Sequence, residues 1–246
     1  MFVVVPCYNE ETRLDVEAFY NFATEHSAFK FLFVNDGSRD GTASRLEELC
    51  AKLPERLVWL DLEKNGGKAE AVRRGVLQAL TDSPEVVGFW DADLATPLWE
   101  LPAFLDVFDR RDDVELVVGS RVKLMGRAIE RKAARHLSGR VFATAASLTL
   151  GLPFYDTQCG AKAFRVTSIT PALFTEPFRS RWLFDVELCA RLVQERGREA
   201  TLQSIYEYPL REWVDVDGSK LTYWDFVRAT GELYGIYREY ASIREE

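Results

Sequence analysis

A chain of 246 residues with 47% hydrophobic and 28% charged residues is long enough for one full hydrophobic core and has the composition of a globular domain. Its net charge of −8 argues against general binding to nucleic acid. The four cysteines are widely separated, which excludes the usual zinc and disulfide spacings and is typical of reduced thiols in a cytoplasmic protein. We expect neither a leader peptide nor a membrane-spanning helix, because the first strand starts right after Met1 and no apolar segment reaches about 20 residues.

Short apolar segments alternate with amphipathic ones through the first half of the chain. The apolar segments predict buried strands at residues 2–5, 29–34, 57–62, 86–90 and 116–118. Each of the first four is followed by a segment whose apolar residues recur at helical spacing, beginning near Asp15 in the first case. Alternating strands and helices with short connections predict a mostly parallel, doubly wound α/β sheet with helices on both faces.

Polar, charged or glycine-rich clusters follow all five predicted strands. The clusters comprise residues 6–11, 35–42, 64–68, 91–93 and 119–121. Because the carboxyl ends of parallel strands meet at one edge of a sheet, these clusters should converge there and form a binding crevice.

The fourth predicted strand ends in two carboxylates, Asp91 and Asp93, that are separated only by Ala92. Carboxylate oxygens at such an edge are the ligands that Mg²⁺ or Mn²⁺ prefers, together with the phosphates of a substrate. The alternative is a turn whose carboxylates cap the next helix, since Thr96 and Pro97 have the composition of a helix start.

The alternation stops after Arg121. The pattern there predicts a long helix over about 129–150, a second helix over 184–195, a strand over 200–208 and a final helix over 223–240. No linker separates the two halves, so we expect a single domain over residues 1–246.

Basic residues are concentrated between positions 121 and 140, against the acidic balance of the whole chain. Seven cations lie there and Glu130 is the only acid; the cations are Arg121, Lys123, Arg127, Arg131, Lys132, Arg135 and Arg140. This strip predicts an anionic partner, such as a phosphate monoester bound bidentately by arginine. The alternative is a solvated helix face that is also attracted to a lipid surface.

Eight short motifs, in this order, resemble those of the inverting, nucleotide-sugar-dependent glycosyltransferases of family 2, which have the GT-A fold. Four lie in the first half, at residues 6–10 (Pro-Cys-Tyr-Asn-Glu), 35–38 (Asn-Asp-Gly-Ser), 65–68 (Asn-Gly-Gly-Lys) and 91–93 (Asp-Ala-Asp). Those of the second half, at 119–121, 156–160, 181–188 and 217–220, resemble the dolichyl-phosphate glucosyltransferase and mannosyltransferase branch, and its glucosyl members more closely. Two positions depart from the family, Asn35 where Asp is common and Ala95 where many mannosyl members carry Gln.

The resemblance implies roles for the residues of the first half, which would bind the nucleotide sugar (residues 1–121). Asp93 would be the direct ligand of Mg²⁺ or Mn²⁺, and Asp91 would face the ribose or a metal-bound water. The residues implied in holding the base and ribose are Pro6, Tyr8, Glu10, Asp36 and Ala92. Lys68 opens a helix after two glycines, a position suited to an anionic group. The structural alternatives are a packed loop aromatic for Tyr8, a local turn for Asp36 and a solvated surface lysine for Lys68.

The second half, residues 122–246, would be the acceptor side. The resemblance implies two arginines on the acceptor phosphate, with Arg121 as the first and Arg135 as the second by spacing, or else Arg131. Asp156 and Asp185 need only orient groups if the acceptor is a phosphate, which is already anionic at neutral pH. For a hydroxyl acceptor Asp185 is the candidate base, and the structural alternative for both is capping. We expect Trp182 and Phe184 to be core or sugar-stacking residues.

These expectations predict an enzyme that moves glucose from UDP-glucose to a polyprenyl or dolichyl phosphate, attached peripherally to the cytoplasmic face of a membrane. GDP-mannose as donor and a soluble hydroxyl acceptor are the alternatives. A sugar nucleotidyltransferase is disfavoured because its amino-terminal Gly-x-Gly-x-Arg loop is missing, and a non-catalytic nucleotide-binding module because Asp91 and Asp93 are both present. The oligomeric state is left open.

Overall fold

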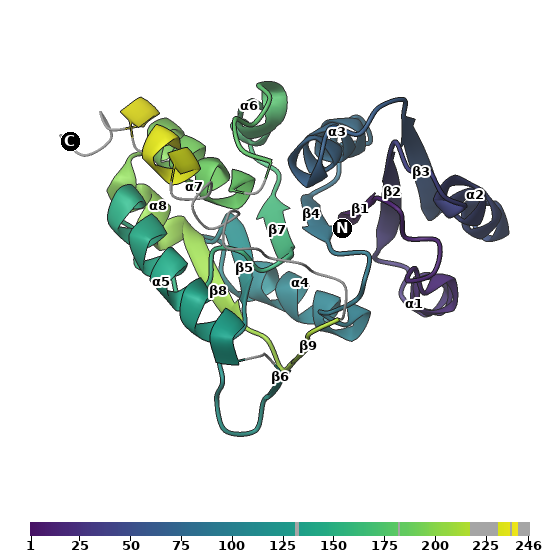
Figure 1. Cartoon of the computed structure of the whole chain (residues 1–246), viewed down its shortest axis with the longest axis horizontal. Helices are drawn as coiled ribbons and strands as arrows, with labels where there is room; N and C mark the ends of the chain where they lie inside the picture. Colours follow the sequence, from purple (N-terminus) through teal and green to yellow (C-terminus); the bar gives the residue numbers. More distant parts are fainter. Residues whose placement is uncertain (131–132, 182, 217–230, 237, 241–246) are drawn as a thin grey trace.

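The structure is a computed structural model that describes residues 1–130, 133–181, 183–216, 231–236 and 238–240, with the backbone alone at 133–138. Within these ranges seven strands form one sheet (Figure 1). They are β1 (Phe2–Cys7), β2 (Lys30–Asp36), β3 (Leu57–Leu62), β4 (Val86–Trp90), β5 (Leu116–Ser120), β7 (Ala161–Arg165) and β8 (Ile205–Pro209), in the spatial order β3-β2-β1-β4-β7-β5-β8. All neighbours pair in parallel except β7, which is antiparallel to both β4 and β5.

Helices cover both faces of the sheet because successive side chains of each strand point to opposite sides. On one face Val4 and Val34 pack with α3 (Lys68–Leu80), α5 (Ala133–Leu150), α6 (Thr170–Thr175) and α7 (Phe184–Arg196). On the other, Val3 and Phe33 pack with α1 (Val16–Glu25), α2 (Thr42–Lys52) and α4 (Leu101–Arg110). The prediction of a mostly parallel, doubly wound sheet with helices on both faces is therefore confirmed.

Strand β7 is the main feature that the sequence pattern did not predict. Its sequence, Ala-Lys-Ala-Phe-Arg, carries two charges in five residues, so it lacks the apolar run of the other strands. Because β7 runs antiparallel, its beginning lies at the carboxyl edge of the sheet, where Ala161 pairs with Trp90 at the end of β4. The preceding loop, residues 156–160, is thereby delivered next to Asp91.

Three predicted boundaries are wrong or untested. The long helix does not begin at Ile129, because Ala128–Glu130 form the short strand β6, which pairs in parallel with β9 (Glu212–Val214). The strand expected over 200–208 begins only at Ile205, since Arg198–Ser204 form helix α8, in which the Thr201 hydroxyl donates to Gly197 O at 2.7 Å. Of the final helix expected over 223–240, residues 223–230 and residue 237 lie outside the described part of the chain. Residues 231–236 are helical.

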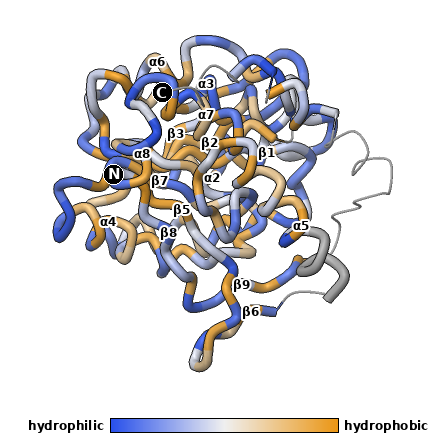
Figure 2. The backbone as a smooth tube through the Cα atoms, turned by 90° about the vertical axis from the view of Figure 1, so that its left-hand side faces the viewer, coloured by the Kyte–Doolittle hydropathy of each residue, from blue (hydrophilic) through white to orange (hydrophobic). Residues whose placement is uncertain are grey.

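None of the helices in the described ranges combines the length and the apolar character needed to cross a bilayer. The hydropathy of the chain follows the layers instead: in Figure 2 the strands are predominantly hydrophobic and the outer turns hydrophilic.

Candidate active site

Asp91 lies at the centre of the polar residues predicted from the sequence. It follows β4 directly, and its negative charge acts on the pKa of five other predicted or neighbouring site groups, which are Glu10, Lys68, Asp93, Arg121 and Asp185. These residues come from the ends of β1, β4 and β5 and the starts of α3 and α7. The predicted convergence at the carboxyl edge of the sheet is therefore observed.

Lys68 forms an ion pair with Asp91. It is the first residue of α3 and follows Gly67, whose φ of 90° turns the chain sharply into the helix. Burial alone would lower the pKa of the Lys68 amine, but the charges of Asp91 and Asp185 outweigh it and raise that pKa. Both side chains are about one third exposed.

Asp93 lies two residues further along a tight turn in which Leu94 has a φ of 52° and its N–H bonds Asp91 O at 3.3 Å. The Asp93 Oδ1 atom accepts the N–H of Ala95 at 3.1 Å, so the carboxylate does stabilise the turn. Helical structure begins only at Leu98, which argues against a helix-capping role. Burial, followed by the charge of Asp91, raises the pKa of Asp93. Two repelling carboxylates at the end of a buried strand fit a divalent cation, which would offset that repulsion.

Glu10 adds a third carboxylate close to the aspartate pair. Its Oε1 accepts from Arg13 Nη2 at 2.5 Å, while its Oε2 is buried without a hydrogen-bond partner. Burial raises the pKa of Glu10 to about 6, and the charges of Asp93 and Asp91 add to the effect. Across the ranges the structure describes, no three His, Cys, Asp or Glu side chains are close enough to bind a metal by themselves. A metal here would need substrate oxygens, as Mg²⁺ usually does.

Replacing Glu10 by Gln should stabilise the protein at neutral pH. A carboxyl with a pKa of about 6 when folded and 4.5 when unfolded favours folding fully below pH 4.5, and this contribution is lost as the pH rises through 6. The glutamine variant avoids that loss, so its free energy of unfolding near pH 7 should exceed that of the parent by up to about 2 kcal/mol. Urea unfolding at a series of pH values tests this, with Glu63→Gln at an exposed position as control. A difference that does not shrink toward about pH 4 would contradict it.

Asp36 holds the glycine-rich loop that precedes Lys68. The carboxylate is 2% exposed and accepts the N–H of Gly66 at 2.7 Å and of Gly67 at 2.8 Å, and the side-chain amide of Asn65 at 2.9 Å. Burial raises the pKa of Asp36, and these backbone N–H groups partly offset the rise. In this structure both oxygens bind the 65–67 loop. The implied role in base recognition stays a prediction.

The loop after β1 presents Tyr8, which is 41% exposed and therefore does not match the packed-aromatic alternative. Asn9 fastens this loop to the one after β2, since its N–H donates to Ser38 Oγ at 3.0 Å and its Oδ1 accepts from Arg39 N at 2.9 Å. Pro6 is half-buried and Ala92 is buried. The contacts implied for these residues with a base and ribose stay predictions.

Arg121 and Asp156, which the sequence analysis treated separately, form a bidentate ion pair. Arg121 Nε and Nη2 lie 2.5 and 2.7 Å from the two carboxylate oxygens of Asp156. Burial would lower the pKa of Arg121, but Asp156 outweighs it and raises that pKa. Glu207 holds the start of the 156–160 loop by accepting hydrogen bonds from the N–H groups of Tyr155 and Asp156, each at 2.9 Å. Arg131 lies outside the described residues, as does the side chain of Arg135, so the second arginine stays a prediction.

Lys162 of β7, a buried lysine that the sequence did not predict as a site residue, holds the 156–160 loop. It is 1% exposed and donates to Asp185 Oδ1 at 2.6 Å, Cys159 O at 2.7 Å and Thr157 O at 3.1 Å. These contacts use all three N–H groups of the ammonium. Burial raises the pKa of Asp185, and Lys162 and Lys68 partly offset it. A lysine between two alanines, next to Phe164, was the available signal.

Gly160 connects this loop to the aspartate pair. A Cβ atom at this position would lie 1.8 Å from Asp91 Oδ2, so only glycine lets the loop and the carboxylate approach this closely. Residues 156–160 thus contact Arg121 through Asp156 at one end and Asp91 through Gly160 at the other. The loop is a direct physical link between the two predicted substrate sides.

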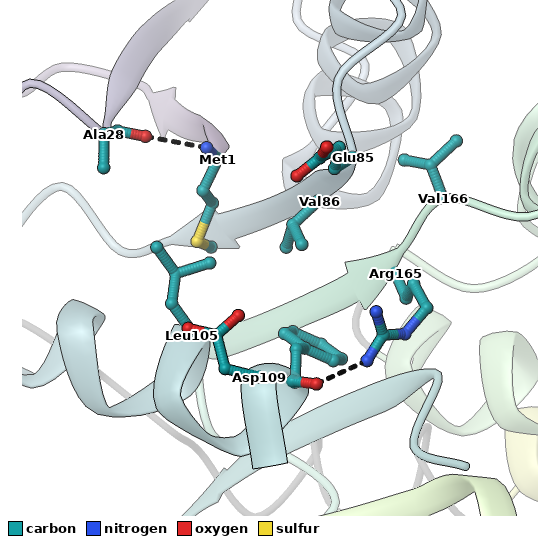
Figure 3. A pocket seen from close by; sticks show the side chains of 9 residues that line it. Met1, Ala28, Glu85, Val86, Leu105, Asp109, Arg165 and Val166 are labelled. Atoms are coloured by element: carbon teal, nitrogen blue, oxygen red, sulfur yellow. Dashed lines mark hydrogen bonds between the residues drawn. The ribbon is translucent and has the colours of Figure 1, made fainter. Parts of the chain in front are cut away.

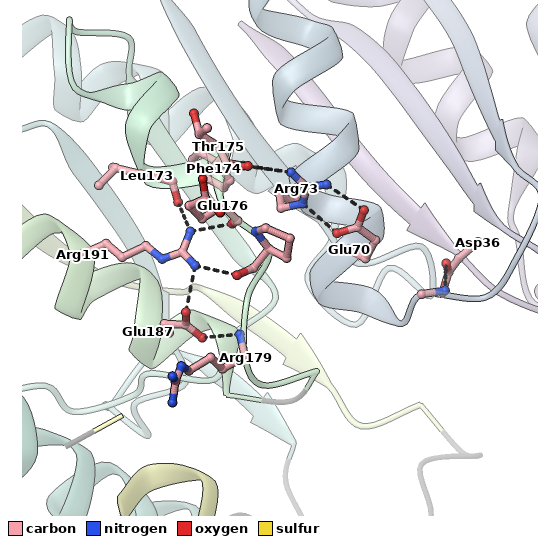
Figure 4. Close-up of polar contacts among 12 residues, drawn as sticks. Asp36, Glu70, Arg73, Leu173, Phe174, Thr175, Glu176, Arg179, Glu187 and Arg191 are labelled. Carbon is pink, nitrogen blue, oxygen red and sulfur yellow. Dashed lines mark hydrogen bonds and ion pairs between the residues drawn. The ribbon is translucent and has the colours of Figure 1, made fainter. Parts of the chain in front are cut away.

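Arg181 is a second site residue for which the sequence predicted no role. Its side chain lies against Gly67, because a Cβ there would be 3.2 Å from Arg181 Cδ, and its charge partly offsets the rise that burial causes in the pKa of Asp36. The preceding segment is well anchored, as Figure 4 shows: Arg191 donates to Leu173 O, Glu176 O and Pro177 O at 2.8–2.9 Å. Arg181 thus adds a cation above the glycine-rich loop. Phe184 is in the core beside Phe89, as expected, and Trp182 lies outside the described residues.

A pocket lies at the opposite, amino edge of the sheet and is distinct from this site (Figure 3). Val86 at the start of β4 lines it, together with Met1, Glu85 and Arg165. The Arg165 guanidinium is bonded to Phe108 O at 2.7 Å and Val114 O at 3.2 Å, which explains its presence there as a structural anchor. Open α/β sheets bind ligands at the carboxyl edge, where Asp91 lies.

Comparison with known proteins finds relatives along most of the chain. Residues 2–169 match the family described as Glycosyl transferase family 2. The dolichyl-phosphate beta-glucosyltransferase of Drosophila melanogaster is 32% identical over 260 residues, 97% of this chain and 74% of that protein. That of Dictyostelium discoideum is 30% identical, covering 89% and 68%. The solved glucosyl-3-phosphoglycerate synthase of Mycobacterium tuberculosis with UDP superimposes with a TM-score of 0.68 at 18% identity, covering 96% of this chain and 79% of that one.

The chain therefore belongs to glycosyltransferase family 2, and the resemblance noted in its motifs is confirmed. The GT-A fold is confirmed as well.

Proposed function

We propose that this protein transfers glucose from UDP-glucose, with inversion, to a polyprenyl or dolichyl phosphate. The observation that carries the proposal is the 156–160 loop, which binds Arg121 at one end and packs on Asp91 at the other. This contact supports a site in which Arg121 would bind the acceptor phosphate beside the carboxylates that would bind the donor. The relatives named dolichyl-phosphate beta-glucosyltransferase support the sugar and the lipid.

On the donor side, residues 1–121 would hold the nucleotide sugar. Asp93 and Asp91 would hold Mg²⁺ or Mn²⁺, which when bound would neutralise charge developing on the leaving diphosphate. Lys68 and Arg181 lie at the same glycine-rich loop and would add two positive charges at the diphosphate. Glu10, Tyr8 and Pro6 would line the base and ribose.

On the acceptor side, residues 122–246 would complete the same single domain. A phosphate monoester is an anionic nucleophile at neutral pH and needs no general base. Asp156 and Asp185 are 6% and 5% exposed, and each forms an ion pair with a cation, Arg121 and Lys162 respectively. A general base must reach the proton that it removes. This favours the phosphate acceptor over the hydroxyl acceptor, with Asp156 orienting Arg121 and Asp185 orienting Lys162.

A donor and acceptor panel tests the proposal. Labelled UDP-glucose or GDP-mannose is incubated with polyprenyl phosphate in detergent, with Mg²⁺, with Mn²⁺ or with EDTA, and the organic and aqueous phases are counted. We expect label from UDP-glucose in the organic phase, lost with EDTA and restored by adding the metal. Label from GDP-mannose alone would overturn the donor, and sugar transferred to a water-soluble product would overturn the acceptor. Full transfer in EDTA would overturn the metal role.

A further inference from the structure

The segment between β5 and β6 protrudes from the body of the molecule in both views (Figure 1 and Figure 2). At its tip Leu124 is 48% exposed and Met125 is 103% exposed. A Cβ built on Gly126 would meet nothing within 4 Å, so the tip is open on that side too. Two large apolar side chains are therefore exposed to solvent in the turn of a protruding loop.

The local backbone holds this tip in one shape. The N–H of Arg127 donates to Leu124 O at 3.1 Å, and Gly126 has a φ of 80°, as the third residue of a tight turn requires. Below the turn, β6 pairs with β9, and the N–H of Ala128 donates to Arg211 O at 2.8 Å. The turn is thus ordered before any partner binds, which reduces the entropy lost on binding.

The charge around the tip indicates what it contacts. Lys123 and Arg127 flank the two apolar residues, and the stretch 121–140 holds seven cations and one acid in a chain of net charge −8. Apolar side chains between cations are typical of segments at a membrane interface, where the apolar groups enter the acyl region and the cations meet lipid phosphates. A purely apolar protein partner would not account for the cations.

We propose that the tip, residues 123–127, inserts into the interface of a membrane that contains anionic lipids. The same loop begins at Arg121, four residues before Met125, so the two are at most about 14 Å apart along the chain. Insertion would therefore bring Arg121 to the level of the lipid headgroups. A role of Arg121 in binding a lipid-borne phosphate at that level rests on the proposed function. The insertion itself does not rest on it.

Vesicle flotation tests the insertion. Two kinds of vesicle are used, phosphatidylcholine alone and phosphatidylcholine with about 30% phosphatidylglycerol. Each is mixed separately with the parent chain, with L124S/M125S, with K123S/R127S and with L202S. The last variant is the control, because Leu202 is 40% exposed on α8. We expect the parent to bind the anionic vesicles. Its affinity for them should fall about tenfold or more in L124S/M125S and about fivefold for each cation removed in K123S/R127S, and it should be unchanged in L202S. Equal binding by the parent and L124S/M125S, or no binding by the parent, would overturn the proposal.

Transfer assays separate this proposal from the proposed function. With polyprenyl phosphate in detergent, L124S/M125S should transfer at the parental rate, which also shows that it is folded, and with polyprenyl phosphate in vesicles it should be slower. If the parent transfers nothing in detergent but binds anionic vesicles through the tip, the proposed function fails and the insertion stands. If both proteins transfer equally from vesicles and bind them equally, the insertion fails and the proposed function stands.

Discussion

Replacing Asp93 by Asn should lower the kcat/KM of sugar transfer about a hundredfold or more without destabilising the fold. The substitution removes the charged oxygen that would bind the metal, and loss of a metal ligand exceeds the 10–100-fold effects typical of residues behind the ligands. Burial and the charge of Asp91 raise the pKa of Asp93, so the folded chain disfavours its ionised form. The neutral amide should therefore leave the free energy of unfolding near pH 7 unchanged or higher.

Two measurements check this result. The first is kcat/KM at saturating Mg²⁺, with Asp106→Asn on the exposed surface of α4 as the matched control. The second is the affinity for Mn²⁺ in the presence of UDP, which should fall in the Asp93 variant and stay unchanged in the control. Near-normal turnover with normal Mn²⁺ affinity would show that Asp93 is a turn residue only.

Replacing Lys162 by Met should destabilise the protein by about 3–5 kcal/mol, because it leaves the buried Asp185 carboxylate without its cation. It also removes the donor that holds Thr157 O and Cys159 O. Urea unfolding measures the loss. A change below about 1 kcal/mol would mean that the pair is better hydrated than its burial indicates.

A double variant separates the structural from the positioning role of Lys162. K162M/D185L replaces the ion pair by apolar side chains and should regain most of the stability, since such exchanges are often neutral. Its kcat/KM should nevertheless stay about tenfold or more below the parent, because the 156–160 loop that packs on Asp91 has lost its anchor. Asp185→Asn keeps both carbonyl contacts of Lys162 and should be more active than the double variant. Parental activity in the double variant would contradict the positioning role.

The spacing of apolar residues predicted the helices and strands well where one or both faces of a segment are apolar. The strand over 57–62 matches β3 residue for residue, and the helix expected after Asp15 begins at Val16 with Asp15 as its cap. Burial of apolar residues in a fixed period leaves a clear signal in the sequence. The pattern failed at β7, and at α8, where residues 200–208 were expected to form a strand, because tertiary contacts override weak local preference.

The sequence by itself therefore determined the family, the alternating α/β order and the identity of most polar residues at the carboxyl edge. The tertiary structure alone decided which of them pair: Lys68 with Asp91, Arg121 with Asp156, and Lys162 with Asp185. The partners are 23 to 35 residues apart in the last two pairs, and the antiparallel insertion of β7 between β4 and β5 brings them together. Periodicity reports how a segment is buried, whereas the partner of a charge depends on strand order, which no local pattern contains.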